Sequence, residues 1–284
     1  MIRYAELHSH TNMSFLDGAS HPAEMVELAA ELGYAALGIT DHDGFRGVAK
    51  VHQAARQIGM PIVYGTEVGM PRVAAQRVGS FSPSQAMPTV TTDAPPSRGK
   101  WSSVSESGGV GKYVHPSAGE SPEHRRGRIR RMHGSKPTSK PETDHIVLLA
   151  PGPAGYAALS RFVTKGQFCG RKDEPRYDYR DLEEASLHGK LVALSGCHQG
   201  AVNRAALAGD LNAAIAATEH LRDLFPGRFY LEVWDHGKPE DGYRNDLISE
   251  VARITRTPLI ATNNVHYARR HDADLAEVLA AIAG

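Results

Sequence analysis

The sequence predicts an α/β protein built as a barrel of about seven strand–helix units. Short apolar runs alternate with amphipathic stretches along most of the chain, which is the pattern of strands covered by helices. With 284 residues and 41% hydrophobic content, the chain can bury a core large enough for such a barrel. Because no glycine-rich dinucleotide loop follows any of the strands, we favour a barrel over an open sheet.

Seven segments have the apolar character expected of strands that are covered on both faces. They are residues 3–9, 34–41, 61–68, 145–150, 191–197, 229–235 and 258–265. Since helical patterns lie between most of them, we expect the strands to run parallel.

The spacing of apolar residues places four helices between these strands. In residues 21–33, the predicted buried face consists of Met25, Leu28, Ala29 and Leu32. The second helix has on one face Val48, Val51, His52 and Ala55, and we interpret His52 as a packed or half-exposed residue. Residues 211–225 form a third helix and residues 246–256 a fourth, whose core stripe consists of Leu247, Ile248, Val251 and Ile254.

Polar side chains gather where the strands end, and in such barrels the chemistry lies at that end. His8 and His10 end the first strand, and their i, i+2 spacing sends both side chains to one face. The other strand ends and the first loop contribute Asp17, Asp41, His42, Glu67, Cys197, Asn264 and His266. Imidazole, carboxylate and thiolate groups that converge at one barrel mouth are ligands for zinc, with manganese or iron at the more carboxylate-rich positions.

Each of these residues also has an ordinary structural interpretation. An isolated His-x-His pair belongs more often to packing than to a metal site, Asp41 is suited to cap a helix, and Cys197 is suited to fill the core. Their joint position at strand ends favours a site. His145 is the exception, because it begins its strand and the spacing alone does not select it.

The cysteine count and the hydropathy of the chain predict its compartment. Two cysteines, Cys169 and Cys197, are too few for a disulfide framework, which favours a cytoplasmic protein. The N-terminus lacks a basic segment followed by an apolar run, and no stretch of about 18 apolar residues occurs, so we expect neither a signal peptide nor a membrane span.

A basic, proline-rich stretch interrupts the strand–helix pattern. Residues 71–143 contain 12 Lys/Arg and 5 Asp/Glu, so this stretch carries +7 and the remainder of the chain −7. It has no helical or strand periodicity, and we expect a disordered insertion over residues 72–143 that divides the barrel into residues 1–71 and 144–284. Its basic end, residues 123–140, is suited to contact phosphate backbones; the alternative is a solvated loop without function.

Six blocks follow one another along the chain: "ELHSHTNMSFLDGAS", "GYAALGITDHDGFRGV", "YGTEV", "HIVLLAPGPAGYAALSRFVT", "LVALSGCHQGAV" and "IATNNVHYAR". Together they resemble the PHP (polymerase and histidinol phosphatase) domain of bacterial DNA polymerase III alpha subunits. The residues of these blocks are most similar to those of the error-prone polymerases. The resemblance implies a distorted (β/α)7 barrel that holds one to three divalent metal ions, which would be zinc, manganese or iron.

Carried over position by position, the resemblance implies a set of nine residues that hold metal and carry catalysis. They are His8, His10, Asp17, His42, Glu67, His145, Cys197, Asn264 and His266. The sequence departs from the family pattern at Asn264, where a metal-competent site has Asp. An amide oxygen can coordinate a metal, but it supplies no negative charge and cannot act as a base.

The resemblance implies a metal-dependent phosphoesterase, acting as a 3′→5′ exonuclease on DNA primer ends within an error-prone polymerase of DNA replication and translesion repair. Its partners would be the polymerase core of the parent protein and, through that protein, the sliding clamp and other translesion factors. No polymerase palm fits in this chain, which we expect to be an N-terminal portion. One alternative is a non-catalytic metal-binding scaffold that braces the polymerase core, which Asn264 favours. The other is a small-molecule phosphatase of the histidinol-phosphate type.

Overall fold

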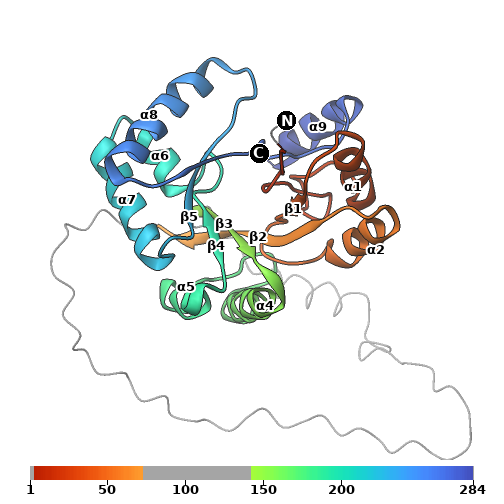
Figure 1. The fold of residues 1–284 in the computed structure, drawn as a ribbon, viewed down its shortest axis with the longest axis horizontal. Helices are drawn as coiled ribbons and strands as arrows, with labels where there is room; N and C mark the ends of the chain where they lie inside the picture. The colour runs from red at the N-terminus through yellow and green to blue at the C-terminus, as the bar shows by residue number, and fades with distance from the viewer. Residues whose placement is uncertain (1–2, 73–141, 284) are drawn as a thin grey trace, which may run out of the picture. The chain divides into compact units, whose positions relative to one another are not determined.

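The computed structural model describes residues 3–72 and 142–283, and its centre is a curled six-stranded sheet in the order β1-β2-β3-β4-β5-β6 (Figure 1). The strands are β1 (Leu37–Ile39), β2 (Ile62–Pro71), β3 (Thr143–Ala150), β4 (Val192–Leu194), β5 (Phe229–Val233) and β6 (Leu259–Ala261). Each overlaps one of the predicted strand segments. The predicted insertion lies almost wholly outside the described residues.

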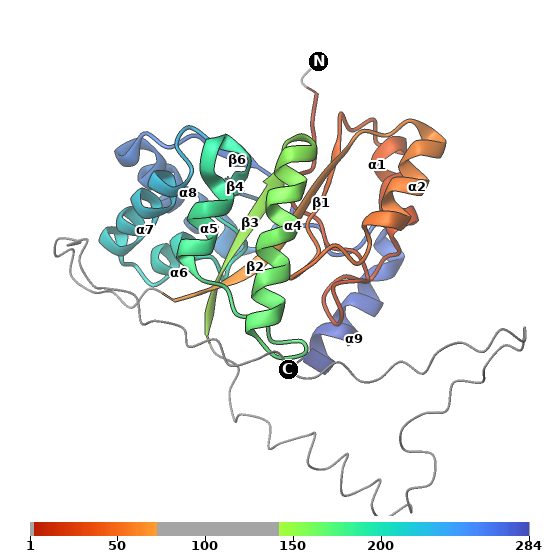
Figure 2. The same cartoon turned by 90° about the horizontal axis from the view of Figure 1, so that it is seen from below.

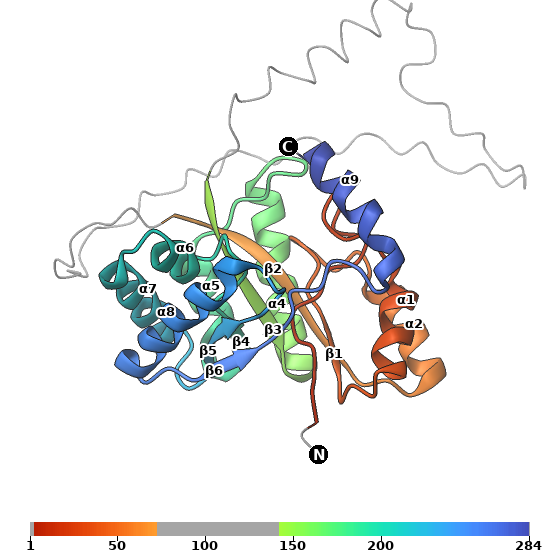
Figure 3. The ribbon, with the colours of Figure 1, turned by 90° about the horizontal axis from the view of Figure 1, so that it is seen from above.

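The predicted first strand closes the sheet into a ring, although only single bridges mark it (Figure 3). On one side, the Gly38 amide of β1 donates a hydrogen bond of 2.6 Å to the Glu6 carbonyl. On the other side, the His10 amide donates one of 2.8 Å to the carbonyl of Val265, which follows β6. Residues 4–10 therefore take the place of a seventh strand, and the predicted distorted α/β barrel is confirmed in the form of a curled half-barrel.

The prediction that all strands run parallel is wrong for β3. It pairs antiparallel with β2 on one side and with β4 on the other, while the remaining pairs within the sheet are parallel. The reversal follows from the connection between β2 and β3, which is a hairpin and not a crossover: Pro71 at the end of β2 is paired with Thr143 at the start of β3. The start of β3 therefore lies at the same mouth as the ends of the parallel strands.

Helices cover the outside of the sheet. They are α1 (Pro22–Glu31), α2 (Val48–Ile58), α4 (Gly152–Cys169), α5 (Tyr179–Ser186), α6 (Ala201–Leu207), α7 (Leu211–Leu224), α8 (Pro239–Thr255) and α9 (Ala273–Ala283), with the 3₁₀ turns η1 (Leu187–Gly189) and η2 (Arg270–Asp272). Figure 1 shows α1 and α2 beside β1 and the group α6 to α8 beside β5, and Figure 2 shows α4 along β2 and β3. Among the described helices, none is long and apolar enough to cross a membrane.

Three of the predicted helix faces need correction. In α1, Val26 joins Met25 and Ala29 in the core, whereas the predicted core residue Leu32 is 56% exposed. Leu32 is the C-cap residue of the helix and lies beyond its buried residues Met25, Val26 and Ala29. By contrast, α7 matches its prediction closely.

Helix α8 begins seven residues before its predicted start. Its first two turns are polar, so the apolar stripe that marked the prediction begins late, although Pro239 in the first turn is a helix-start signal. Ile248 and Val251 are buried as predicted, whereas Ile254 is 42% exposed. In α2, the interpretation of His52 as packed or half-exposed is wrong: the residue is exposed, and its ring forms one hydrogen bond with the Tyr64 hydroxyl.

The interior of the barrel changes from apolar to polar along the strands. Val147, Leu149 and Leu194 fill it together with the partly buried Leu7, Val63, Val192, Tyr230 and Ile260. Side chains alternate between the two faces of a strand. The next inward-facing residues of β2, β3 and β5 towards one mouth of the barrel are therefore Glu67, His145 and Glu232. The period of two thus brings three ionisable groups to the same end of the barrel.

Candidate metal centre

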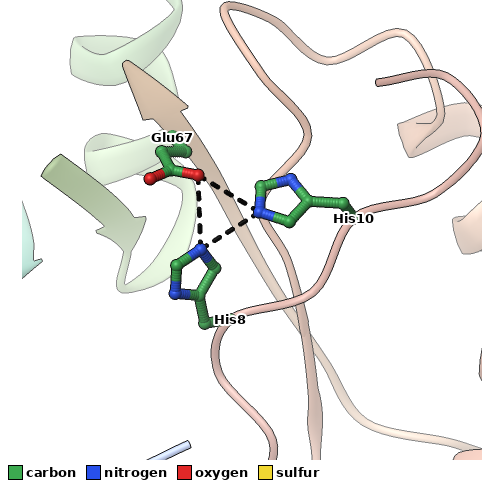
Figure 4. A group of neighbouring side chains, drawn as sticks. All are labelled: His8, His10 and Glu67. Carbon is green, nitrogen blue, oxygen red and sulfur yellow. Dashed lines mark hydrogen bonds and ion pairs between the residues drawn. The ribbon is translucent and has the colours of Figure 1, made fainter. Parts of the chain in front are cut away.

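Glu67 lies at the middle of a cluster of histidines at this mouth. Its Oε2 is 3.2 Å from His10 Nε2 and 3.4 Å from His8 Nε2, and its Oε1 is 3.0 Å from His145 Nδ1. Figure 4 shows His8, His10 and Glu67 converging from the closing strand and β2. Because His8 and His10 are fully buried and Glu67 is only 1% exposed, the cluster's inner side is closed to solvent.

The cluster offers three overlapping sets of metal ligands. Within each set, one ligand atom per residue lies within 4.8 Å of the others: His8, His10 and Glu67; His10, Asp17 and His42; His42, Glu67 and His145. Each of His10, His42 and Glu67 belongs to two sets. Ions in neighbouring sets would therefore share ligands, as adjacent ions in polynuclear sites do.

Asp17 organises the solvent-facing side of the cluster. Its Oδ2 is 3.2 Å from His42 Nε2, and its Oδ1 is 3.2 Å from His266 Nδ1. The rings of His42 and His266 stack on His10, with centroid separations of 4.6 and 5.1 Å. Asp17, His42 and His266 remain 31, 27 and 32% exposed, so this is the side from which a ligand can enter.

Cys197 and Asn264 lie at the edge of the cluster. Cys197 Sγ is 3.3 Å from His145 Nδ1 and the residue is buried, but it belongs to none of the three ligand sets. Asn264 is 6% exposed, has a positive φ of 43°, and its Oδ1 has no hydrogen-bond partner among the described residues. Eight of the nine predicted residues thus contact one another at this mouth, whereas the Asn264 side chain makes no contact with the others within the described part of the chain.

The loop that carries Asp17 is fastened to the end of β1. Asp41 accepts hydrogen bonds from the Thr11 amide at 2.7 Å and from the Ser14 hydroxyl at 2.8 Å, and the two groups belong to the start of this loop. Gly18 lies so close to the Thr11 carbonyl that a Cβ there would be 2.1 Å from its oxygen. Asp41 therefore shapes the loop and is not a helix cap. Glycine is required at position 18, where the loop packs against the Thr11 carbonyl.

The cluster holds protons where a metal would bind. Burial raises the pKa of Glu67, but the charges of His42 and His8 and hydrogen bonds from His10 and His145 outweigh it and hold that pKa well below its usual value. Burial lowers the pKa of His42, but Glu67 and Asp17 outweigh it and raise the pKa to about 9. In the metal-free protein, protonated His42 therefore compensates the buried carboxylates, as a cation would.

Other members of the cluster titrate according to their burial. Burial, together with the positive charges of His42 and His8, lowers the pKa of His10 to about 3, so His10 keeps a lone pair free at neutral pH. Burial raises the pKa of the Cys197 thiol, and the charge of Glu67 raises it further. A thiol in this position becomes a ligand only if a bound cation displaces its proton.

The donor set fits divalent transition metals. Imidazole and carboxylate donors predominate, which suits zinc, manganese and iron. Nδ1 of buried His10 and Oδ1 of Asn264 lack hydrogen-bond partners among the described residues, and an ion or its bound water would satisfy such atoms.

The structure also identifies two buried carboxylates that the sequence interpretation missed. Glu232 of β5 is fully buried, with Oε1 2.6 Å from His8 Nδ1. Glu6 is 1% exposed and accepts hydrogen bonds from the Tyr4 hydroxyl and from the amides of His8 and Asn263. The signal that finds Glu232 is the alternation in "FYLEV", since it stands two residues after the inward-facing Tyr230.

Fold and cluster together define an α/β-barrel protein with a candidate metal centre at one mouth. Residues 6–236 match the PHP domain, and this match covers most of the chain. The chain therefore belongs to the PHP domain family.

Relatives of the chain are bacterial DNA polymerases. Over 99% of its length it is 34% identical to an error-prone DNA polymerase of Nocardia farcinica and 28% identical to a DNA polymerase III subunit alpha of Deinococcus radiodurans. It spans only 23% and 17% of those two proteins, and corresponds to their N-terminal part. A two-domain protein of Bacteroides vulgatus, said to contain a predicted PHP-like metal-dependent phosphoesterase, matches 96% of this chain and 55% of its own at 12% identity and a TM-score of 0.46.

Proposed function

We propose that this chain is a metal-dependent phosphoesterase module of an error-prone DNA polymerase, and that it removes nucleotides from DNA 3′ ends. The observation that carries the proposal is the overlap of three ligand sets through His10, His42 and Glu67. The relatives supply the nucleic acid context, since they are DNA polymerases of which the chain resembles one part. On this proposal, the primer end and the remaining polymerase domains are its partners.

Each ligand has a position-specific role in this proposal. His8, His10 and Glu67 would hold the innermost ion, while Asp17, His42 and His145 would complete the two outer positions. When bound, the ions supply positive charge for the phosphate and a bound water of lowered pKa. The partly exposed edge formed by Asp17, His42 and His266 admits the phosphodiester, because the inner side is closed.

Asn264 favours a second candidate, a metal-binding scaffold without catalysis. An aspartate at that position would add a negative charge, whereas the amide is neutral. The smaller negative charge would weaken metal binding at one position. The phosphate would then contact fewer metal ions than it does in a fully occupied centre. In that case, the centre would stabilise the barrel and brace the polymerase core.

Cleavage of a 3′-labelled primer by the purified chain with manganese tests the proposal. We expect shortening of the primer from its 3′ end, and we expect His10→Asn to abolish it. His52→Asn is the matched control, since His52 is exposed on α2 and outside all three ligand sets. Equal cleavage by His10→Asn would refute a catalytic role for this centre.

Two further measurements separate the alternatives. Tight metal binding without cleavage of any phosphoester would favour the scaffold. Hydrolysis of histidinol phosphate without primer cleavage would instead favour the small-molecule phosphatase.

A further inference from the structure

Glu232 contacts the edge of the His8 ring that faces away from the candidate metal position. Its Oε1 is 2.6 Å from His8 Nδ1, while His8 Nε2 is 3.1 Å from His10 Nε2 and 3.4 Å from Glu67 Oε2. Figure 4 shows that the second nitrogen of His8 points away from Glu67. Since the two ring nitrogens lie on opposite sides, Glu232 cannot share the ligand position that Nε2 faces.

We propose that Glu232 is a positioning residue that fixes His8 with its Nδ1 proton on the carboxylate and its Nε2 lone pair directed at the metal. A carboxylate only accepts hydrogen bonds, so a neutral His8 beside it must carry its proton on Nδ1. Metal-binding histidines commonly use such a partner to fix ring orientation and tautomer. The inference rests on the metal centre of the proposed function, but not on exonuclease activity.

The surroundings of Glu232 hold its carboxylate in place. The Thr262 hydroxyl donates a hydrogen bond to the same Oε1 that contacts His8, and the Glu232 amide donates one of 2.9 Å to the Ser195 hydroxyl. Neighbouring strands β4 and β6 thus supply one anchor each, at their ends. The fully buried side chain has little freedom to turn away from His8.

The charge of Glu232 gives it a second effect on the centre. Its Oε2 is buried and has no hydrogen-bond partner among the described residues, so its negative charge is incompletely compensated by hydrogen bonds. An uncompensated buried charge is costly. A divalent ion on the opposite edge of His8 would compensate it, which makes His8 a stronger ligand than an imidazole without a carboxylate partner.

Manganese and zinc affinities of the full chain, measured by chelator competition, test the inference. We expect Glu232→Gln to lower the affinity about 10- to 100-fold, the usual effect of losing such a partner. The amide can donate to Nδ1 and thereby favour the tautomer whose proton blocks Nε2. Thr262→Val keeps the carboxylate but removes its anchor, so we expect a smaller loss.

Glu6→Gln is the matched control. Glu6 is also a buried carboxylate in contact with His8, but it accepts a hydrogen bond from the His8 amide and not from the ring. A loss of affinity as large as that of Glu232→Gln would show general disruption and overturn the inference. Thr262→Val provides the test if Glu232→Gln does not fold.

Ring nitrogen spectra provide a readout that does not depend on activity. In long-range ¹H–¹⁵N spectra of the zinc-loaded protein, with His8 assigned through His8→Asn, we expect a protonated Nδ1 and a metal-bound Nε2. Unchanged affinity and unchanged His8 signals in Glu232→Gln would overturn the role of Glu232 and leave the metal centre standing. A natural protein that binds no metal would overturn both.

Discussion

The raised pKa of His42 predicts that metal affinity increases steeply with pH. A metal ion needs the imidazole lone pair, so it must displace the proton that Glu67 and Asp17 hold on His42. The pKa of His42 is about 9 in the folded metal-free protein. The proton therefore stabilises that fold below about pH 6.5, and this contribution disappears as pH rises through about 9. Metal affinity has the opposite dependence, because it increases as pH rises towards the pKa of His42.

The size of the effect follows from that value. At pH 7 roughly 1% of molecules carry a neutral His42, and at pH 9 about half do, so affinity should rise about 50-fold. Glu67 and Asp17 do not contribute in this range, because their pKa values are lowered and both stay ionised. His8, whose pKa is also raised, adds to the slope. We therefore regard about 50-fold as the minimum.

Chelator competition with manganese at pH 7, 8 and 9 under anaerobic conditions measures this slope. His42→Asn should bind metal more weakly and with a shallower dependence on pH, while His52→Asn should behave as the natural protein does. An increase of less than about tenfold between pH 7 and 9 would refute the assignment of the proton to His42. An equal slope in His42→Asn would refute it as well.

Three further predictions concern the chain around the centre. Replacing residues 73–141 by Asn-Gly should leave the barrel folded and raise its stability by up to about 3 kcal/mol, because a closed loop of about 70 residues becomes a hairpin turn. Calorimetry showing a lower melting temperature would contradict this. Asn264→Asp should raise manganese affinity and primer cleavage by about tenfold or more, since even a screened unit charge beside a divalent ion contributes more than about 1.4 kcal/mol. Unchanged affinity and cleavage would show that the amide is an adequate ligand. Gly18→Ala should weaken metal binding by displacing the Thr11 carbonyl, whereas the control Gly44→Ala should not, because its Cβ would meet nothing within 4 Å. Equal metal affinities of the two variants, measured by chelator competition, would contradict this prediction.

The sequence was sufficient to place the strands but not to orient them. Apolar runs reveal that a segment is a strand, yet the direction of β3 depends on how its ends connect, and the long insertion before it hides a hairpin. For this reason, spacing could not select His145, which the resemblance included among the expected ligands and whose Nδ1 lies 3.0 Å from Glu67 Oε1 in the structure.

Glu232 was missed for a different reason. It stands within an apolar strand, and single-residue interpretation gives a carboxylate there no special meaning. Glu232 shares the inward face of β5 with Tyr230. Its contact with His8 becomes evident only when the position of His8 in space is known. Such residues become predictable when alternation along each strand is followed through to the mouth of the barrel.

The closing strand has a consequence for how the protein is made. His8 and His10 are synthesised long before Val265, which completes the pairing of their strand, and Glu232 and His266 also come from the later part of the chain. At 5–20 residues per second, a ribosome needs on the order of tens of seconds to supply those residues. During that interval, His8 and His10 on the nascent chain lack the pairing with Val265 and the contact with Glu232, although His42 and Glu67 follow them closely. The complete surroundings of the metal centre, with Glu232 and His266 in place, can therefore form only after this late part of the chain has been synthesised.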